Sequence, residues 1–160
     1  MNDTFYARRF EEADAKAVSE LITTTMRISN SKDYSAERIE KDVKAFSVEG
    51  VLQRASWTHF YVICSGEKII GCGAIGPYWG SEVESSLFNI FVDPVWQGKG
   101  VGRMIMETLE ADEYFLRAKR VEIPASITGC EFYKKMGYTY KNGIDTVDEE
   151  QLFRLEKFRE

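Results

Sequence analysis

The chain has few of the residues from which disulfide frameworks and metal sites are built. It contains a single histidine, His59, and three cysteines, Cys64, Cys72 and Cys130, without a Cys-x-x-Cys pair. An odd number of scattered cysteines indicates reduced, mostly buried thiols, as in a cytoplasmic protein. No cluster of histidine, cysteine and carboxylate residues has the spacing of metal ligands, so we predict no metal site. His59 falls on a predicted strand, where a structural role is favoured, and no cysteine has the histidine partner that a catalytic thiol needs.

Long apolar runs and an excess of positive charge are also missing. No segment approaches the roughly 18 uninterrupted apolar residues of a membrane helix, and the first residues lack the apolar core of a signal peptide. We therefore expect neither secretion nor membrane insertion. The net charge of −5 argues against nucleic acid as the main partner, because phosphate binding needs a basic face. A cationic substrate would suit this charge, but an ordinary acidic surface explains it more simply.

Length and composition fit one globular domain, residues 1–160. The chain has 160 residues, of which 44% are hydrophobic and 29% charged, and it shows no internal repeat or linker. Strands are predicted at residues 4–10, 57–64, 68–75, 87–92, 120–124, 138–141 and 151–158. Helices are predicted after caps at Asp14 and Ser35, and over residues 100–117 and 127–136. This order, βααβββαβαββ, excludes the regular βαβ series of a dinucleotide-binding fold.

A strand, a tight turn and a helix meet between Asp93 and Arg103. The apolar run 87–92 enters the segment DPVWQGKGVGR, and apolar residues recur at helical spacing after it. Glycines stand where the helix begins, so free N–H groups and the positive end of the helix dipole should converge there and suit a phosphate. The segment is not a P-loop, because GxxxxGK[ST] is missing, and not GxGxxG, because residue 103 is Arg.

Three motifs together resemble the GCN5-related N-acetyltransferases, the GNAT family. QGKGVG at residues 97–102, after a Val-Asp-Pro strand end, is similar to the pyrophosphate loop of that family. FYKKMGY at residues 132–138 resembles its C-terminal FYxxxGY motif, and FRLEK at residues 153–157 resembles its closing strand. The resemblance covers almost the whole chain and implies an α/β (α+β mixed) fold. Its central mixed, mostly antiparallel sheet would have about seven strands, with about four helices on both faces, and would be splayed between strands four and five.

The resemblance implies acetyl-CoA as the cosubstrate. Its pyrophosphate would bind main-chain amides of Gly98, Lys99, Gly100, Val101 and Gly102. Lys99 and Arg103 could add positive charge or remain solvated. The uncharged Gln97 would shape the loop or donate a hydrogen bond to a phosphate oxygen.

The pantetheine arm of the cosubstrate would lie in the gap between strands four and five. It would follow the backbone of Ile90, Phe91 and Val92, with an N–H group of this strand near the thioester oxygen to stabilise the oxyanion. Core packing of the three side chains is compatible with this role, because the contact uses their backbone. Ser126 stands where many family members carry an Asn that touches the cofactor, and an ordinary turn or capping role is the alternative.

Tyr133 matches the tyrosine that donates a proton to the departing thiolate in many family members. A neutral phenol suits this task at pH 7, since a phenol has a pKa of roughly 10 and a thiol roughly 8.5. Packing on a helix face is the alternative.

Some members use a strand-four Glu as general base, but the matching position here is near Ser86. Glu84, two residues earlier on the same strand face, is therefore the candidate, with Glu82 weaker and a water chain ending on backbone carbonyls as the alternative.

The acceptor pocket of the family is built from loops that here cover residues 30–34, 78–82 and 142–148. The aromatic residues Tyr34, Tyr78 and Trp79 could line an apolar wall, pack beneath their loops, or face a second copy of the chain in a homodimer. The acids Asp33, Glu82 and Asp145 could attract a cation.

We predict an acyltransferase that moves an acetyl group from acetyl-CoA to a primary amine of a small molecule or peptide, by direct attack in a ternary complex. The alternative is a CoA-binding sensor or interaction module with the same fold and little catalysis.

Overall fold

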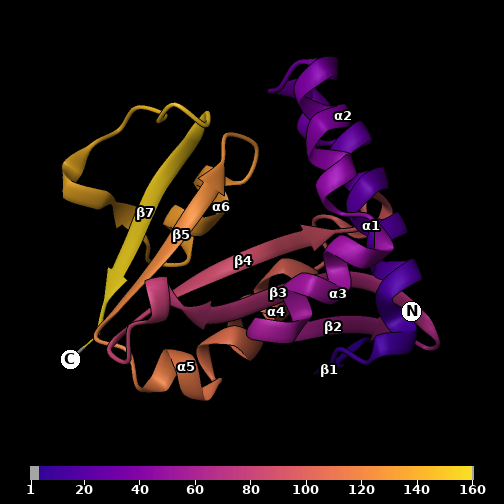
Figure 1. Ribbon diagram of the computed structural model, residues 1–160, viewed down its shortest axis with the longest axis horizontal. Coiled ribbons are helices and arrows are strands. Elements are labelled where there is room, and N and C mark those ends of the chain that lie inside the picture. The colour runs from indigo at the N-terminus through magenta and orange to yellow at the C-terminus, as the bar shows by residue number, and fades with distance from the viewer. Residues whose placement is uncertain (1–3, 160) are drawn as a thin grey trace.

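One seven-stranded sheet runs through the protein in the order β1-β2-β3-β4-β5-β7-β6 (Figure 1). The computed structural model describes residues 4–159. The strands are β1 (Tyr6–Arg9), β2 (His59–Ser65), β3 (Lys68–Pro77), β4 (Glu84–Val92), β5 (Arg120–Ser126), β6 (Thr139–Tyr140) and β7 (Leu152–Phe158). Neighbouring strands are antiparallel except for the parallel pair of β4 and β5. The predicted mixed, mostly antiparallel sheet is therefore confirmed.

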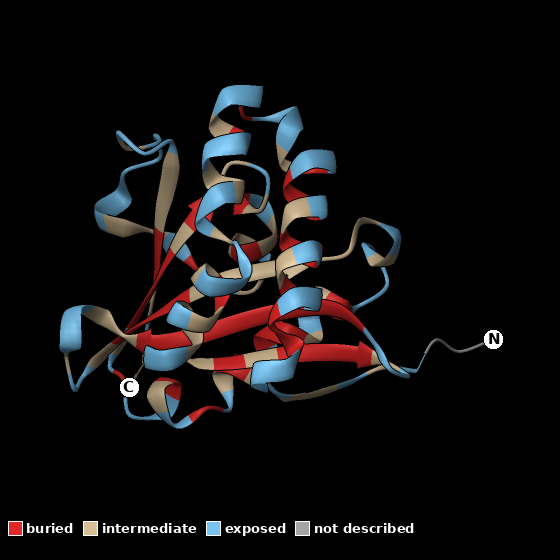
Figure 2. Ribbon diagram, turned by 45° about the vertical axis from the view of Figure 1, so that its right-hand side comes forward, coloured by how far each residue is buried: buried red, intermediate tan, exposed pale blue. Residues whose placement is uncertain are grey.

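Helices cover both faces of this sheet. They are α1 (Ala15–Ile28), α2 (Ala36–Ala45), α3 (Val48–Trp57), α4 (Val101–Glu110), α5 (Glu113–Leu116) and α6 (Cys130–Lys135). The first three pack against one face and the last three against the other, each over its own buried apolar cluster. Figure 2 shows the strands as the most buried part of the molecule and the outer helix surfaces as exposed. None of the helices in residues 4–159 has the length and apolar character needed to cross a bilayer.

The described chain has six α-helices, two more than the sequence predicted, and each extra helix has a local cause. The hydroxyl of Ser47 accepts a hydrogen bond from Gly50 N at 3.2 Å and starts α3, over residues to which the sequence assigned no element. Asp112 divides the predicted helix 100–117 because its carboxylate accepts from Tyr114 N at 2.8 Å and caps α5. The same carboxylate lies 2.9 Å from His59 Nδ1 on β2, a contact between distant segments that periodicity cannot show. His59 therefore has a structural partner.

The splay between β4 and β5 is the feature that creates space for a ligand. The two strands pair only at three positions, from Glu84 with Arg120 to Ser86 with Glu122, and then diverge, as Figure 1 shows. Further along, β4 contains a bulge opposite β3, and Asn89 in the bulge has a φ of 57°. From Leu87 onward, the edge of β4 that faces β5 has no strand partner, so its backbone polar groups face the gap.

Candidate functional site

A cavity of about 710 Å³ occupies the gap between β4 and β5. Residues 87–92 of β4 form one wall, and Ile123 and Pro124 of β5 contribute to the opposite wall. Helices α1 and α2 close it on one face of the sheet, and the start of α4 together with α6 closes it on the other. The cavity thus runs through the sheet and can receive ligands from both helical layers.

The loop before α4 presents backbone N–H groups to one end of this cavity. Gly98 and Gly100 have positive φ values of 77° and 91°, a conformation that residues with a Cβ atom rarely adopt. The first hydrogen bond of α4 runs from Met104 N to Gly100 O at 3.1 Å, so the three preceding N–H groups point out of the helix end. At Gly102 a Cβ atom would lie 3.0 Å from the Phe132 ring, so glycine also permits close helix packing. Free N–H groups and the helix dipole together suit a phosphate.

The side chains around this loop have separate roles. Gln97 Nε2 donates to Ser29 Oγ at 3.1 Å and to Val92 O at 3.2 Å, so it ties the loop to the residue that follows α1 and to the end of β4. The ammonium group of Lys99 lies over the Trp96 ring, 5.4 Å from its centre. Arg103 is exposed at the cavity wall beside the glycines, where its charge can reach an anion.

The unpaired edge of β4 forms the middle of the cavity. Ile90, Phe91 and Val92 all line it, and the Phe91 ring packs edge-on against Phe46, the residue after α2, with centroids 5.9 Å apart. On the side facing β3, the Cys72 thiol donates to Asn89 O at 3.2 Å and supports the bulge. An extended arm with amide groups can pair with such an edge as an added strand would.

Tyr133 of α6 faces the cavity on the side of the α4 loop. Its side chain is buried, at 7% exposure. Burial is the main cause that raises the pKa of its hydroxyl well above the usual tyrosine range, and the nearby Cys72 thiol raises it further. The group is therefore neutral at pH 7 and able to donate a proton. Ser126 Oγ accepts from Gly129 N at 3.0 Å, which fixes the turn leading into α6 while Ser126 also lines the cavity.

The family comparison agrees with this geometry. The model of the acetyltransferase (GNAT) domain matches residues 56–140, more than half of the chain. The chain belongs to the GNAT acetyltransferase family. A search of curated proteins finds no significant match.

Solved structures share the GNAT fold over nearly the full length of the chain. PaiA N-acetyltransferase from Thermoplasma acidophilum, in complex with coenzyme A, superposes with a TM-score of 0.80 at 17% identity, covering 98% of this chain and 99% of that one. A GCN5-related N-acetyltransferase from Rhodopseudomonas palustris gives 0.79 at 18% identity, with 99% and 98% covered. Ard1 from Thermoplasma volcanium gives 0.69 at 17% identity, with 96% and 97% covered. At these identities the likeness concerns the fold.

Most residues singled out by the GNAT motifs meet around the one cavity. Those that line it are Ile90, Phe91, Val92, Gln97, Gly98, Gly100, Gly102, Arg103, Ser126 and Tyr133. Lys99 and Val101 are not part of the lining, and the Val101 side chain is buried in the core, so only its backbone N–H can face a ligand. The cofactor assignments themselves stay predictions.

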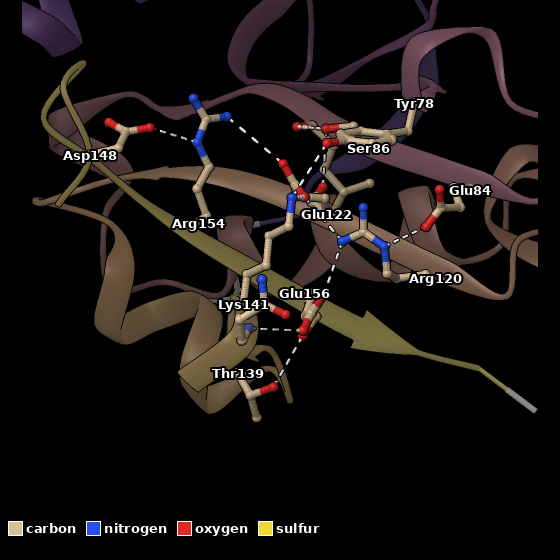
Figure 3. A network of polar contacts seen from close by, with 12 residues as sticks. Tyr78, Glu84, Ser86, Arg120, Glu122, Thr139, Lys141, Asp148, Arg154 and Glu156 are labelled. Carbon is tan, nitrogen blue, oxygen red and sulfur yellow. Dashed lines mark hydrogen bonds and ion pairs between the residues drawn. The ribbon is translucent and has the colours of Figure 1, made fainter. Parts of the chain in front are cut away.

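Glu84 lies elsewhere, at the paired end of β4. Its carboxylate accepts from Arg120 Nε at 2.6 Å, within a network of charges drawn in Figure 3. Arg120 also contacts Glu122 and Glu156 at 3.0 Å each, so it links the start of β4 to β5 and β7. Glu84 does not line the cavity, and its assignment as general base stays a prediction.

Of the three aromatic residues suggested for an acceptor pocket, one lines the cavity and two do not. Tyr34 lines the cavity, but Tyr78 packs between Arg120 and Lys141, with its ring centre 4.9 and 5.5 Å from the two cations. Trp79 is 90% exposed, outside the cavity.

Two lining residues of α2, Arg38 and Asp42, were not predicted as site residues. They flank the apolar residue Ile39, which the sequence did place on the buried face of this helix. Because they adjoin Ile39 on the helix surface, the 3.6-residue period could have indicated that they lie at the edge of the buried face.

The Tyr34 hydroxyl joins three segments at the acceptor side. It donates to Gln151 O at 2.8 Å and accepts from Ile127 N at 2.9 Å. Burial raises the pKa of this hydroxyl, which keeps it neutral and able to donate. The start of α2, the β5–α6 turn and the segment before β7 are therefore held together around one phenol.

Proposed function

We propose that the protein transfers an acetyl group from acetyl-CoA to a primary amine of a small molecule or peptide, within a ternary complex. One observation carries this proposal: a single cavity joins the glycine loop of α4, the unpaired edge of β4 and the Tyr133 hydroxyl. The coenzyme A complex of the Thermoplasma acidophilum relative supports the choice of cosubstrate.

The cosubstrate is bound mainly by backbone groups. Its pyrophosphate accepts hydrogen bonds from amides of residues 98–102, with Arg103 adding charge at the cavity wall. Its pantetheine arm follows Ile90, Phe91 and Val92 along β4. A β4 N–H group donates to the thioester oxygen and stabilises the negative charge that develops there during attack.

Tyr133 acts as the general acid. The neutral amine nitrogen attacks the thioester carbonyl carbon and forms the new C–N bond, and the nitrogen then releases its surplus proton to water. The C–S bond breaks, the departing sulfur takes the proton of the Tyr133 hydroxyl, and the tyrosinate regains a proton from solvent. Burial keeps the Tyr133 hydroxyl protonated at neutral pH, so its proton is present when the sulfur leaves.

The amine must lose its own proton before attack. Neutralising an alkyl ammonium with a pKa near 10.4 at pH 7 costs about 4.6 kcal/mol. Glu84 is bound to Arg120 outside the cavity, so its position gives it no direct access to an amine there. We therefore favour a water chain that ends on backbone carbonyls of the open β4 edge.

Two measurements test the proposed function in turn. Acetyl-CoA should raise the melting temperature and bind saturably at sub-millimolar concentration. Thiol release with a panel of amines and peptides should then identify acceptors. Absence of acetyl-CoA binding would remove the proposal altogether, whereas binding without turnover over a broad panel would favour the CoA-binding sensor.

A further inference from the structure

The cavity wall on the α2 side carries a charged pair beside apolar side chains. Among the described residues that line the cavity, the charged ones are Arg38, Asp42 and Arg103. Arg103 lies in the first turn of α4, beside the glycine loop. Asp42 is thus the one carboxylate among the described lining residues, and its neighbours Ile39 and Phe46 are apolar.

The Asp42 carboxylate is held in place with bonding capacity to spare. Its Oδ2 atom accepts from Arg38 Nε at 2.9 Å. Arg38 is fixed in turn by a 3.2 Å hydrogen bond to Gln151 Oε1 and by lying over the Tyr34 ring, 5.2 Å from its centre. A carboxylate offers about four lone-pair sites, so a second donor can bind Asp42 while Arg38 stays in place.

We propose that Asp42 binds a positive group of the acceptor, so that the acceptor is a small amine with a second positive charge. This inference rests on the proposed function. The nitrogen that attacks must be uncharged, whereas a carboxylate forms its stronger hydrogen bonds with charged donors. The group at Asp42 is therefore a different one from the reacting nitrogen. A cation entering an apolar cavity needs such a partner to offset its desolvation.

The size of the cavity supports a small acceptor. Its volume of about 710 Å³ has to hold the pantetheine arm as well as the acceptor. Pockets for single small ligands span roughly 300–1,000 Å³. A flexible apolar chain between the two nitrogens would pack against Ile39 and Phe46 and reach from α2 toward the opening in the sheet.

The test uses two product-like probes of equal length. Monoacetylated hexanediamine has an amide at one end and an ammonium at the other, and N-heptylacetamide replaces the ammonium with a methyl group. Calorimetry with the wild-type protein and coenzyme A should give about tenfold tighter binding of the charged probe, as expected for one charge-assisted hydrogen bond. Asp42→Asn should abolish this preference.

Glu40→Gln is the matched control, because Glu40 lies on the same helix, is exposed, and pairs with Arg27 at 2.8 Å outside the cavity. It removes the same charge and should keep the preference. Equal affinity of wild type for both probes, no binding of either at millimolar concentration, or a preference retained in Asp42→Asn would overturn the proposal. The same comparison is repeated without coenzyme A and run together with the acetyl-CoA binding assay. If acetyl-CoA does not bind, the proposed function fails; if acetyl-CoA binds but the charged probe is not preferred, only the inference about Asp42 fails.

Discussion

The two sides of the cavity are built by different means. The side proposed for the acetyl donor is made mostly of main chain, from residues 87–103, which are continuous in the sequence. The side proposed for the acceptor is made of side chains from α2 and of loops that meet at Tyr34. The Tyr34 hydroxyl contacts Ile127 and Gln151, which are separated from it by 93 and 117 positions. A common donor can be bound by backbone geometry that tolerates side-chain change, whereas acceptor choice depends on individual side chains and on long-range folding.

The largest expected effect falls where the two sides meet, at Tyr133. Tyr133→Phe removes the proposed proton donor and should lower kcat about 100-fold while acetyl-CoA affinity stays close to wild type. Steady-state kinetics with an identified acceptor, together with calorimetry for acetyl-CoA, measures both. Tyr138→Phe is the control, because the Tyr138 hydroxyl is bound to Glu110 at 3.0 Å outside the cavity, and its loss should affect stability rather than turnover.

The pH profile adds a second check on Tyr133. Its pKa is raised by burial, so the neutral donor form persists as the pH rises through the ordinary tyrosine pKa of about 10. We expect no loss of kcat attributable to this group in that range. A decline near the ordinary value in wild type that is missing from Tyr133→Phe would contradict the raised pKa.

A second prediction tests the backbone character of the donor side. Gly100→Ala places a Cβ atom where φ is 91°, which costs about 1–2 kcal/mol and shifts the loop amides. Acetyl-CoA affinity should fall about tenfold. Gly66→Ala, at φ 60° in the β2–β3 turn, carries the same kind of strain away from the cavity and should leave binding unchanged. Equal binding losses in both variants would mean that general destabilisation explains the effect.

A third prediction concerns the acceptor side alone. Tyr34→Phe leaves Ile127 N and Gln151 O without their shared partner, a loss of about 1 kcal/mol or more. The acceptor KM should rise about fivefold, since the loops that form this wall loosen. Titration should give an unchanged acetyl-CoA affinity. A weaker acetyl-CoA complex with an unchanged acceptor KM would show that the two sides are not separable in this way.

The smallest effect is expected at Glu84. Glu84→Gln breaks a partly exposed ion pair, but Arg120 keeps its contacts with Glu122 and Glu156, so stability should fall by about 1 kcal/mol or less. Because Glu84 does not line the cavity, kcat should change less than about twofold. A large loss of kcat with an unchanged melting temperature would reinstate Glu84 as the base. Glu122→Gln, at the buried centre of the network, should lower the melting temperature more.

The sequence could single out the cavity residues proposed to bind the donor because its signals there are local. Gly100 and Gly102 have fixed offsets from the end of β4, and Tyr133 stands in a contiguous motif. The acceptor side lacks such signals. The position of the Arg38 side chain depends in part on Gln151, which lies 113 positions away. In the same way, the Asp112 carboxylate contacts His59 on a distant strand as well as capping α5.

The position of β7 has a consequence for when the site can form. This strand follows β6 in the chain but lies between β5 and β6 in the sheet. Leu155 of β7 is fully buried in the same apolar cluster as Tyr133. On the ribosome, the glycine loop and Tyr133 emerge before the strand that supports β5 and α6. A nascent chain therefore cannot assemble the cavity until β7 has been synthesised and inserted, which delays any acetylation until translation has passed this strand.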